Sequence, residues 1–251
     1  MWFARVLNTY WPLFLKGTGI TLFLAIVGTV VGFVIGLAVA LVRTMPRQIG
    51  GNKKGGFRNA LLAAINAVLT VYIEVFRGTP MMVQAMLLFY GLTELTGVEI
   101  GNMAAGILVI TLNTGAYMAE IIRGGIQSVD KGQSEAAKAI GMNHWQTMVN
   151  VVLPQGIRNI LPATGNEFVI NLKDSSVLNV IMVGELFYAT RTAAGALYRT
   201  YEPFLIAALI YLILTLVSSR LLKFLEHKLS GNNDFTIVAS SATQGHKNGR
   251  R

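Results

Sequence analysis

Long apolar runs separated by short polar segments make up most of this chain. The runs extend over residues 17–42, 60–92, 103–122, 155–183 and 203–222. A helix needs about 20 apolar residues to cross the hydrocarbon core of a bilayer. The pattern therefore predicts an all-α membrane protein with about five transmembrane helices.

Two of these runs differ from a simple membrane helix. As one helix, residues 60–92 would measure about 49 Å, against roughly 30 Å for the hydrocarbon core. That run either protrudes from the membrane or breaks at Arg77-Gly78-Thr79-Pro80, because glycine and proline weaken the helical ladder. The fourth run is unusually polar, and residues 177–183 are either its continuation or a second short piece.

The first run ends near Ala38-Val39-Ala40, which resembles a signal-peptidase site. Its apolar stretch is far longer than the roughly 7–15 apolar residues of a signal peptide. We therefore interpret it as a retained membrane helix. Gly28, Gly32 and Gly36 give it a small-residue face suited to close packing against another helix.

Composition and charge support this class and set an orientation. Of 251 residues, 53% are hydrophobic and 13% charged, with a formal net charge of +9. Lys and Arg gather between the apolar runs, as expected where charge sets membrane orientation, so nucleic acid is not an expected partner. The basic loops at 43–58 and 123–150 are expected in the cytoplasm. Residues 1–16 then form an extracytoplasmic segment, and residues 226–251 a cytoplasmic tail expected to be disordered.

The sequence offers little for catalysis or cofactor binding. It contains no cysteine, and His144, His227 and His246 lack the spacing of metal ligands, so no metal site is expected. It also lacks a Gly-x-x-x-x-Gly-Lys-Ser/Thr run, the phosphate-binding loop of many ATPases. We therefore expect no enzymatic activity and no cofactor bound by this chain.

A short charged segment between two apolar runs has the features of a docking element. Residues 134–140 are alanine-rich and favour a helix, and Gly141 permits a sharp break. Asn143 can cap a second short helix containing Trp145, and Pro154 fits the first turn of the next long helix. Two short helices with an exposed apolar edge need a groove to fill. The alternative is an ordinary cytoplasmic connector.

This segment resembles the EAA loop of ATP-binding-cassette (ABC) importer permeases. The matching pattern is Glu135-Ala136-Ala137, three residues, Gly141, nine residues and Val151-Val152-Leu153-Pro154, with valine at 151 where the family usually has isoleucine. Other motifs resemble the polar amino acid subgroup: Glu74-x-x-Arg77-Gly78-Thr79-Pro80-x-x-x-Gln84, Tyr117-x-x-Glu120, Arg123-Gly124-Gly125, Leu153-Pro154-Gln155 and Leu172-Lys173-Asp174-Ser175-Ser176. At Ser175 relatives commonly have threonine.

The resemblance covers residues 17–225 and implies a type I ABC importer transmembrane domain with a coupling loop at about 133–154. It implies a second membrane subunit, either a copy or a paralogue, over a cytoplasmic ATPase dimer that binds ATP and Mg. It also implies an external amino-acid-binding protein and a location in the inner, or cytoplasmic, membrane of a bacterial cell. The residues that it assigns to ATPase coupling are Glu135, Ala136, Ala137, Gly141, Trp145 and Pro154.

Polar residues inside the runs are the candidates for substrate binding. An ionisable group in the bilayer costs at least about 2.5 kcal/mol, so it faces a cavity or a partner. Helical spacing places polar residues on stripes from three spans: Glu74, Arg77 and Gln84; Asn113, Tyr117 and Glu120; and Glu167, Asn171 and Asp174. Asn166 and Lys173 are further polar candidates of the fourth span. An amino acid zwitterion needs an acceptor for its ammonium, which Glu167 or Asp174 supplies. It needs a donor for its carboxylate, which Arg77 or Lys173 supplies.

Structural roles compete with substrate binding at these positions. Glu74 and Arg77 could form a buried ion pair, and Asn113 and Tyr117 could bond neighbouring helices. Glu120, one turn from the basic inner edge, is more consistent with a structural role.

The leading functional interpretation is a permease subunit that imports polar amino acids with energy from a partner ATPase. A stand-alone secondary carrier or channel, with intramembrane Glu and Lys as an ion relay, is the alternative from another class. A methionine-type permease is a nearer alternative, against which Arg77-Gly78-Thr79-Pro80 argues. A membrane-embedded enzyme has no supporting motif.

Overall fold

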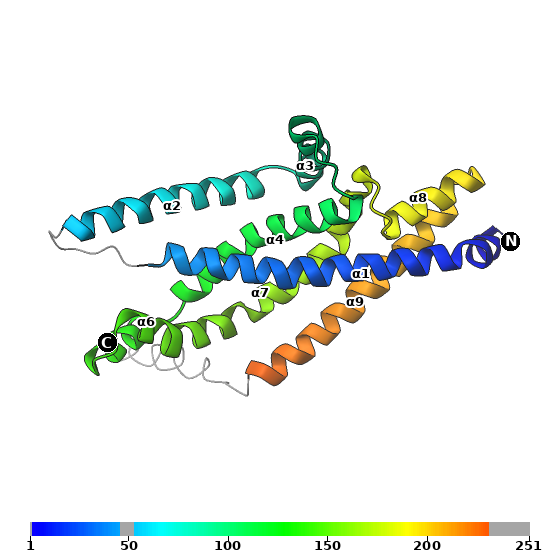
Figure 1. Ribbon diagram of the computed structural model, residues 1–251. Coiled ribbons are helices and arrows are strands. Elements are labelled where there is room, and N and C mark those ends of the chain that lie inside the picture. The colour runs from blue at the N-terminus through cyan, green and yellow to red at the C-terminus, as the bar shows by residue number, and fades with distance from the viewer. Residues whose placement is uncertain (1, 46–52, 231–251) are drawn as a thin grey trace, which may run out of the picture.

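The computed structural model describes residues 2–45 and 53–230, and the regular structure in these ranges is helical (Figure 1). The helices are α1 (Trp2–Arg43), α2 (Lys53–Gly78), α3 (Met81–Thr96), α4 (Asn102–Gln127), α5 (Lys131–Ala139), α6 (His144–Thr147), α7 (Leu153–Asp174), α8 (Leu186–Leu197) and α9 (Tyr201–Ser230). A π-helical turn (Met148–Val152) joins α6 to α7, and a 3-10 helix (Ser175–Ile181) follows α7.

Long helices account for the membrane-spanning part. Among the described residues, four helices are long and apolar enough to cross a membrane: α1, α2 over Phe57–Gly78, α4, and α9 over Tyr201–Glu226. The fifth long helix is α7, whose 22 residues include the polar stripe. The predicted all-α membrane architecture with about five long helices is confirmed.

The centre of the molecule is α1 packed against α4 and α7 (Figure 1). Gly28, Gly32 and Gly36 of α1 face α4. A Cβ at Gly32 would lie 2.7 Å from Thr114 Cγ2, and a Cβ at Gly36 only 2.5 Å from Met118 Cβ. Any side chain larger than hydrogen would push the helices apart, so the small-residue face predicted from the sequence is confirmed.

Polar contacts fix these three helices to one another. The Thr114 hydroxyl of α4 donates to Asn171 Oδ1 of α7, and Asn171 Nδ2 donates to the Thr29 hydroxyl of α1, each at 3.0 Å. Nearer the α5 end of the bundle, Glu120 pairs with Arg43 and Arg123, each at 2.6 Å. The structural role expected for Glu120 is confirmed.

The helix α1 begins at Trp2, well before the expected boundary at Gly17. Val6 and Phe14 are fully buried against α8 and α9, so these early turns have a core of their own. The guanidinium groups of Arg5 and Arg199 lie over the Trp2 ring, at 5.2 and 4.6 Å from its centroid. Residues 2–16 are thus the first turns of α1, because packing against α8 and α9 extends the helix beyond the apolar run.

The other boundaries resolve alternatives that the sequence left open. The run 60–92 breaks: α2 ends at Gly78, and α3 starts after Pro80, which holds an extended conformation. The polar run ends at Asp174, and residues 177–183 lie in a separate 3-10 helix and the turn after it. The last helix runs on to Ser230, beyond the expected boundary at 226. Residues 46–52 and 231–251 lie outside the described ranges, so the expected tail stays a prediction.

The connection before α9 contains a helix that the sequence pattern did not predict. Glu185 starts α8, where its carboxylate accepts the backbone N–H groups of Phe187 and Tyr188 and the Tyr211 hydroxyl at 2.7–3.0 Å. Burial raises the pKa of the Glu185 carboxyl, and these donors act in the opposite direction. The buried carboxylate thereby ties α8 to α9.

The charge-derived orientation is tested with cysteines at the two ends of α4, since the chain has none. Val98, before α4, and Gln127, at its end, are both exposed. In whole cells an impermeant thiol reagent should label V98C and spare Q127C, and inside-out vesicles should give the reverse. Labelling of Q127C in whole cells would overturn the orientation.

Candidate functional site

The segment from Asp130 to Val152 folds as two short helices with strong local stop signals. The Asp130 carboxylate caps α5 by accepting the Gly132 N–H at 2.6 Å. After α5, Gly141 adopts φ +88°, while Gly141 N–H bonds Lys138 C=O and Met142 N–H bonds Ala137 C=O. This is the Schellman pattern, which a left-handed glycine allows. The predicted break at Gly141 is confirmed.

The second short helix is closed by a reciprocal cap. Asn143 Oδ1 accepts the Gln146 N–H, and Gln146 Oε1 accepts the Asn143 N–H, both at 2.9 Å. The predicted Asn143 cap is therefore confirmed. Pro154 lies in the first turn of α7, also as predicted.

The two helices present an apolar edge to solvent. Ile140 is 77% exposed and Trp145 54% exposed, while Ala137, Met148 and Val152 are buried beneath them. Of the other predicted coupling residues, Glu135 and Ala136 are exposed. A hollow of about 560 Å³ lies under α5, with Glu135, Lys131 and Lys138 on its wall. Exposed tryptophan and isoleucine on a firmly capped segment form a surface that a partner can cover.

This edge is joined to α7 without an intervening loop. Two carboxamide side chains donate to backbone carbonyls at the π-helical turn: Asn150 Nδ2 donates to Gln146 C=O at 3.0 Å, and Gln155 Nε2 to Val151 C=O at 2.9 Å. The chain from His144 to Asp174 is therefore helical throughout.

Tyr117 lies with its ring under Arg77, and the other substrate candidates fall into two groups. The first group is held by neighbouring helices: Gln84 and Asn113 bond to the break between α2 and α3, and Asn171 links α1, α4 and α7. In the second group, the charged or polar end of the side chain makes no hydrogen bond or ion pair within the described ranges. Its members are Glu74, Arg77, Asn166, Glu167, Lys173 and Asp174.

Glu167 and Arg77 stand out in that second group. Glu167 is only 6% exposed, yet its carboxylate has no cationic or donor partner among the described residues. Arg77 is exposed and lies over the Tyr117 ring at 5.5 Å. Glu74 makes no ion pair with it, so the alternative of a buried Glu74–Arg77 pair is not observed. Asn166, Lys173 and Asp174 are exposed on α7.

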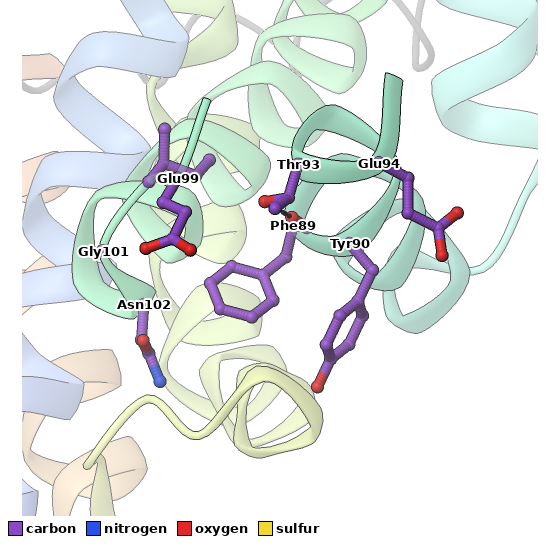
Figure 2. Close-up of a pocket in the computed structure, with 8 residues that line it drawn as sticks. Phe89, Tyr90, Thr93, Glu94, Glu99, Gly101 and Asn102 are labelled. Atoms are coloured by element: carbon purple, nitrogen blue, oxygen red, sulfur yellow. Dashed lines mark hydrogen bonds between the residues drawn. The ribbon is translucent and has the colours of Figure 1, made fainter. Parts of the chain in front are cut away.

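A further hollow, not predicted from the sequence, lies at the turn between α3 and α4. It measures about 540 Å³ and is lined by Phe89, Tyr90, Thr93, Glu94, Glu99, Ile100, Gly101 and Asn102. Figure 2 shows the Glu94 carboxylate pointing away from Glu99, so the two acids do not form one cluster. Only the absence of Lys and Arg from this loop hinted at a distinct surface.

Comparison with known proteins identifies the family of the chain. Residues 57–231 match the family described as binding-protein-dependent transport system inner membrane component. The chain belongs to that family. The glutamine transport system permease protein GlnP of Escherichia coli (strain K12) is 36% identical over 219 residues, covering 87% of this chain and 93% of that protein. The arginine transport system permease protein ArtQ of Bacillus subtilis (strain 168) is 41% identical over 162 residues, covering 64% and 74%.

Solved structures agree with this assignment. A crystal structure of an amino acid ABC transporter with histidines superposes with a TM-score of 0.74 at 39% identity, covering 88% of this chain and 95% of that one. The inward-facing MetNI methionine ABC transporter shares the fold, with a TM-score of 0.63 at 20% identity over 84% and 95%. The permease thus has the transmembrane fold of ABC importers, and its membership argues against the stand-alone carrier.

The break at Gly141 predicts a sharp difference between two substitutions in the permease. Gly141→Val places a β-branched residue at φ +88°, which such side chains rarely adopt, whereas Gly141→Asn tolerates that conformation. We expect the valine variant to insert but to lose transport, and the asparagine variant to keep most of it. The measurements are uptake and co-purification of the ATPase, both normalised to membrane protein. Full uptake by Gly141→Val would exclude coupling through this break.

Proposed function

We propose that this chain is the permease subunit of an ABC importer that moves polar amino acids inward. The observation that carries the proposal is the uninterrupted connection between the apolar edge at Trp145 and α7, which holds the unpaired Glu167. One end of this helical segment meets the energy source, and the other meets the substrate.

The energy comes from a cytoplasmic ATPase dimer whose grooves receive α5 and α6. Ile140 and Trp145 supply the apolar contact, and Glu135 lies on the same exposed surface. ATP and Mg bind to that partner, so this chain needs no cofactor of its own. An external amino-acid-binding protein delivers substrate to the opposite face.

Substrate is recognised by charges that have no partner within the subunit. Glu167 is 6% exposed, and a carboxylate at such a position is costly in a membrane unless a cation joins it; a substrate ammonium is such a cation. Asp174 lies two turns further along α7 and adds negative charge to the path. Arg77, held over Tyr117, can receive the substrate carboxylate.

The exposed polar residues on α7 call for a second membrane subunit. Lys173, Asp174 and Asn166 cannot face lipid at low cost, so they line a water-accessible path. A second copy or a paralogue closes the other side of that path. The assembly lies in the bacterial cytoplasmic membrane, with the N-terminus outside.

Reconstitution tests the proposed function directly. The chain is incorporated in liposomes with and without its ATPase and binding protein, and uptake of labelled basic, acidic and amide amino acids is followed. We expect uptake that requires ATP and both partners. Uptake by the chain alone, without ATP, would indicate a carrier and overturn the proposal.

The α7 carboxylates are tested with amide substitutions. Glu167→Gln and Asp174→Asn keep the shape and remove the charge. Losing one charge-assisted hydrogen bond should cost about 1.5–3 kcal/mol, a roughly ten- to hundredfold rise in half-saturation. The measurement is substrate-stimulated ATP hydrolysis per assembled complex across a substrate series, with Glu94→Gln, on the outer turn, as the matched control. Unchanged half-saturation in both α7 variants would mean that these carboxylates are structural.

A further inference from the structure

The break between α2 and α3 is closed by two carboxamide side chains. Gln84 Nε2 donates to Phe76 C=O at 3.0 Å and to both Thr79 C=O and Thr79 Oγ1 at 2.9 Å. Asn113 Nδ2, from α4, donates to Phe76 C=O at 3.2 Å and to Gln84 Oε1 at 3.0 Å. We call Gln84 and Asn113 the carboxamide clamp.

The clamp supplies hydrogen-bond donors to carbonyls that the helix break leaves without their usual partners. Pro80 has no N–H and Gly78 ends α2, so the last carbonyls of that helix lose their usual partners. A backbone carbonyl left unpaired in a membrane costs several kcal/mol. The clamp pairs the carbonyls of Phe76 and Thr79 and leaves the break intact.

The spacing of the motif explains how Gln84 reaches these carbonyls. A helical side chain points back toward the N-terminus of its helix. Gln84 lies one turn after Pro80 at the start of α3, so its side chain returns to the end of α2. The sequence Arg77-Gly78-Thr79-Pro80-x-x-x-Gln84 therefore encodes a helix break together with the group that closes it.

The clamp lies level with the proposed substrate path. Asn113 is near the middle of α4, and its neighbour Thr114 holds Asn171 of α7. One turn further along α4 is Tyr117, over whose ring Arg77 lies at 5.5 Å. Phe76, the residue that both clamp side chains bond, is directly before Arg77.

We propose that Gln84 and Asn113 are positioning residues, which hold the α2–α3 break so that Arg77 stays over Tyr117, and that they do not bind substrate themselves. Both amide hydrogens of each side chain are directed at protein acceptors, which leaves no donor for a ligand. This inference rests on the proposed function for the role of Arg77, but the geometry of the break can be measured without transport.

The test separates the shape of the break from substrate affinity. Spin labels are placed on cysteines at Val71 and Leu87, two exposed positions on either side of the break, in the assembled transporter. Gln84→Leu and Asn113→Leu should broaden the distance distribution between the labels. Each variant should also raise the amino acid concentration at half-saturation about tenfold, because the charge-assisted contact between Arg77 and the substrate carboxylate is weakened. The maximal rate should change less.

The matched control is Asn66→Leu, the same type of change on α2 at about 15 Å from Phe76 along the helix. It should leave distances and half-saturation unchanged. The double variant Gln84→Leu/Asn113→Leu should have a larger effect than either single change, because each single change leaves Phe76 C=O one side-chain donor and only the double variant removes both.

Two outcomes would overturn the inference. A raised half-saturation with an unchanged distance distribution would make Gln84 and Asn113 substrate ligands. An unchanged half-saturation together with an unchanged distance distribution would mean that they do not position Arg77. If the distances broaden but the wild-type assembly transports no amino acid, the clamp stands and the proposed function fails.

Discussion

A bilayer offers no water to a polar group that loses its partner, so the protein itself must supply one. This requirement accounts for most of the polar contacts inside the described helices. Gln84 and Asn113 close a broken helix, Asn171 bridges three helices, and Glu185 caps a buried helix start. These side chains are occupied by the fold, which separates them from groups that remain available for a ligand.

The available groups are few and carry charge. Glu167 is buried without a partner in the part of the chain that the structure describes, and Arg77 has only an aromatic ring beneath it. The fold holds both residues on helices that packing fixes in place: α7 through Asn171, and the end of α2 through the clamp. Rigid helices that present unsatisfied charges are well suited to recognise a small zwitterion, since little ordering is needed when it binds.

Several of these features could be predicted from the sequence because they depend on local chemistry. The Asn143 cap, the Gly141 break and the glycine face of α1 each follow from the residue type and its spacing. Helical spacing also placed Gln84 and Asn113 on inward stripes, but spacing specifies a face and not a partner, so their bonds to Phe76 could not be predicted. The early start of α1 depends on the distant α8 and α9, and α8 itself depends on the cap at Glu185, so neither leaves a signal in the apolar pattern.

The helical segment from Trp145 to Glu167 has a mechanical consequence. It forms one continuous helical arm, in which the π-helical turn at Met148–Val152 and Pro162 interrupt the regular hydrogen-bond ladder, and Asn150 and Gln155 donate to carbonyls beside that turn. At 1.5 Å per residue the arm is roughly 33 Å long, so a tilt of about 10° moves its far end by roughly 6 Å. A small tilt at Trp145 thereby corresponds to a displacement near Glu167 that is comparable to the width of an amino acid.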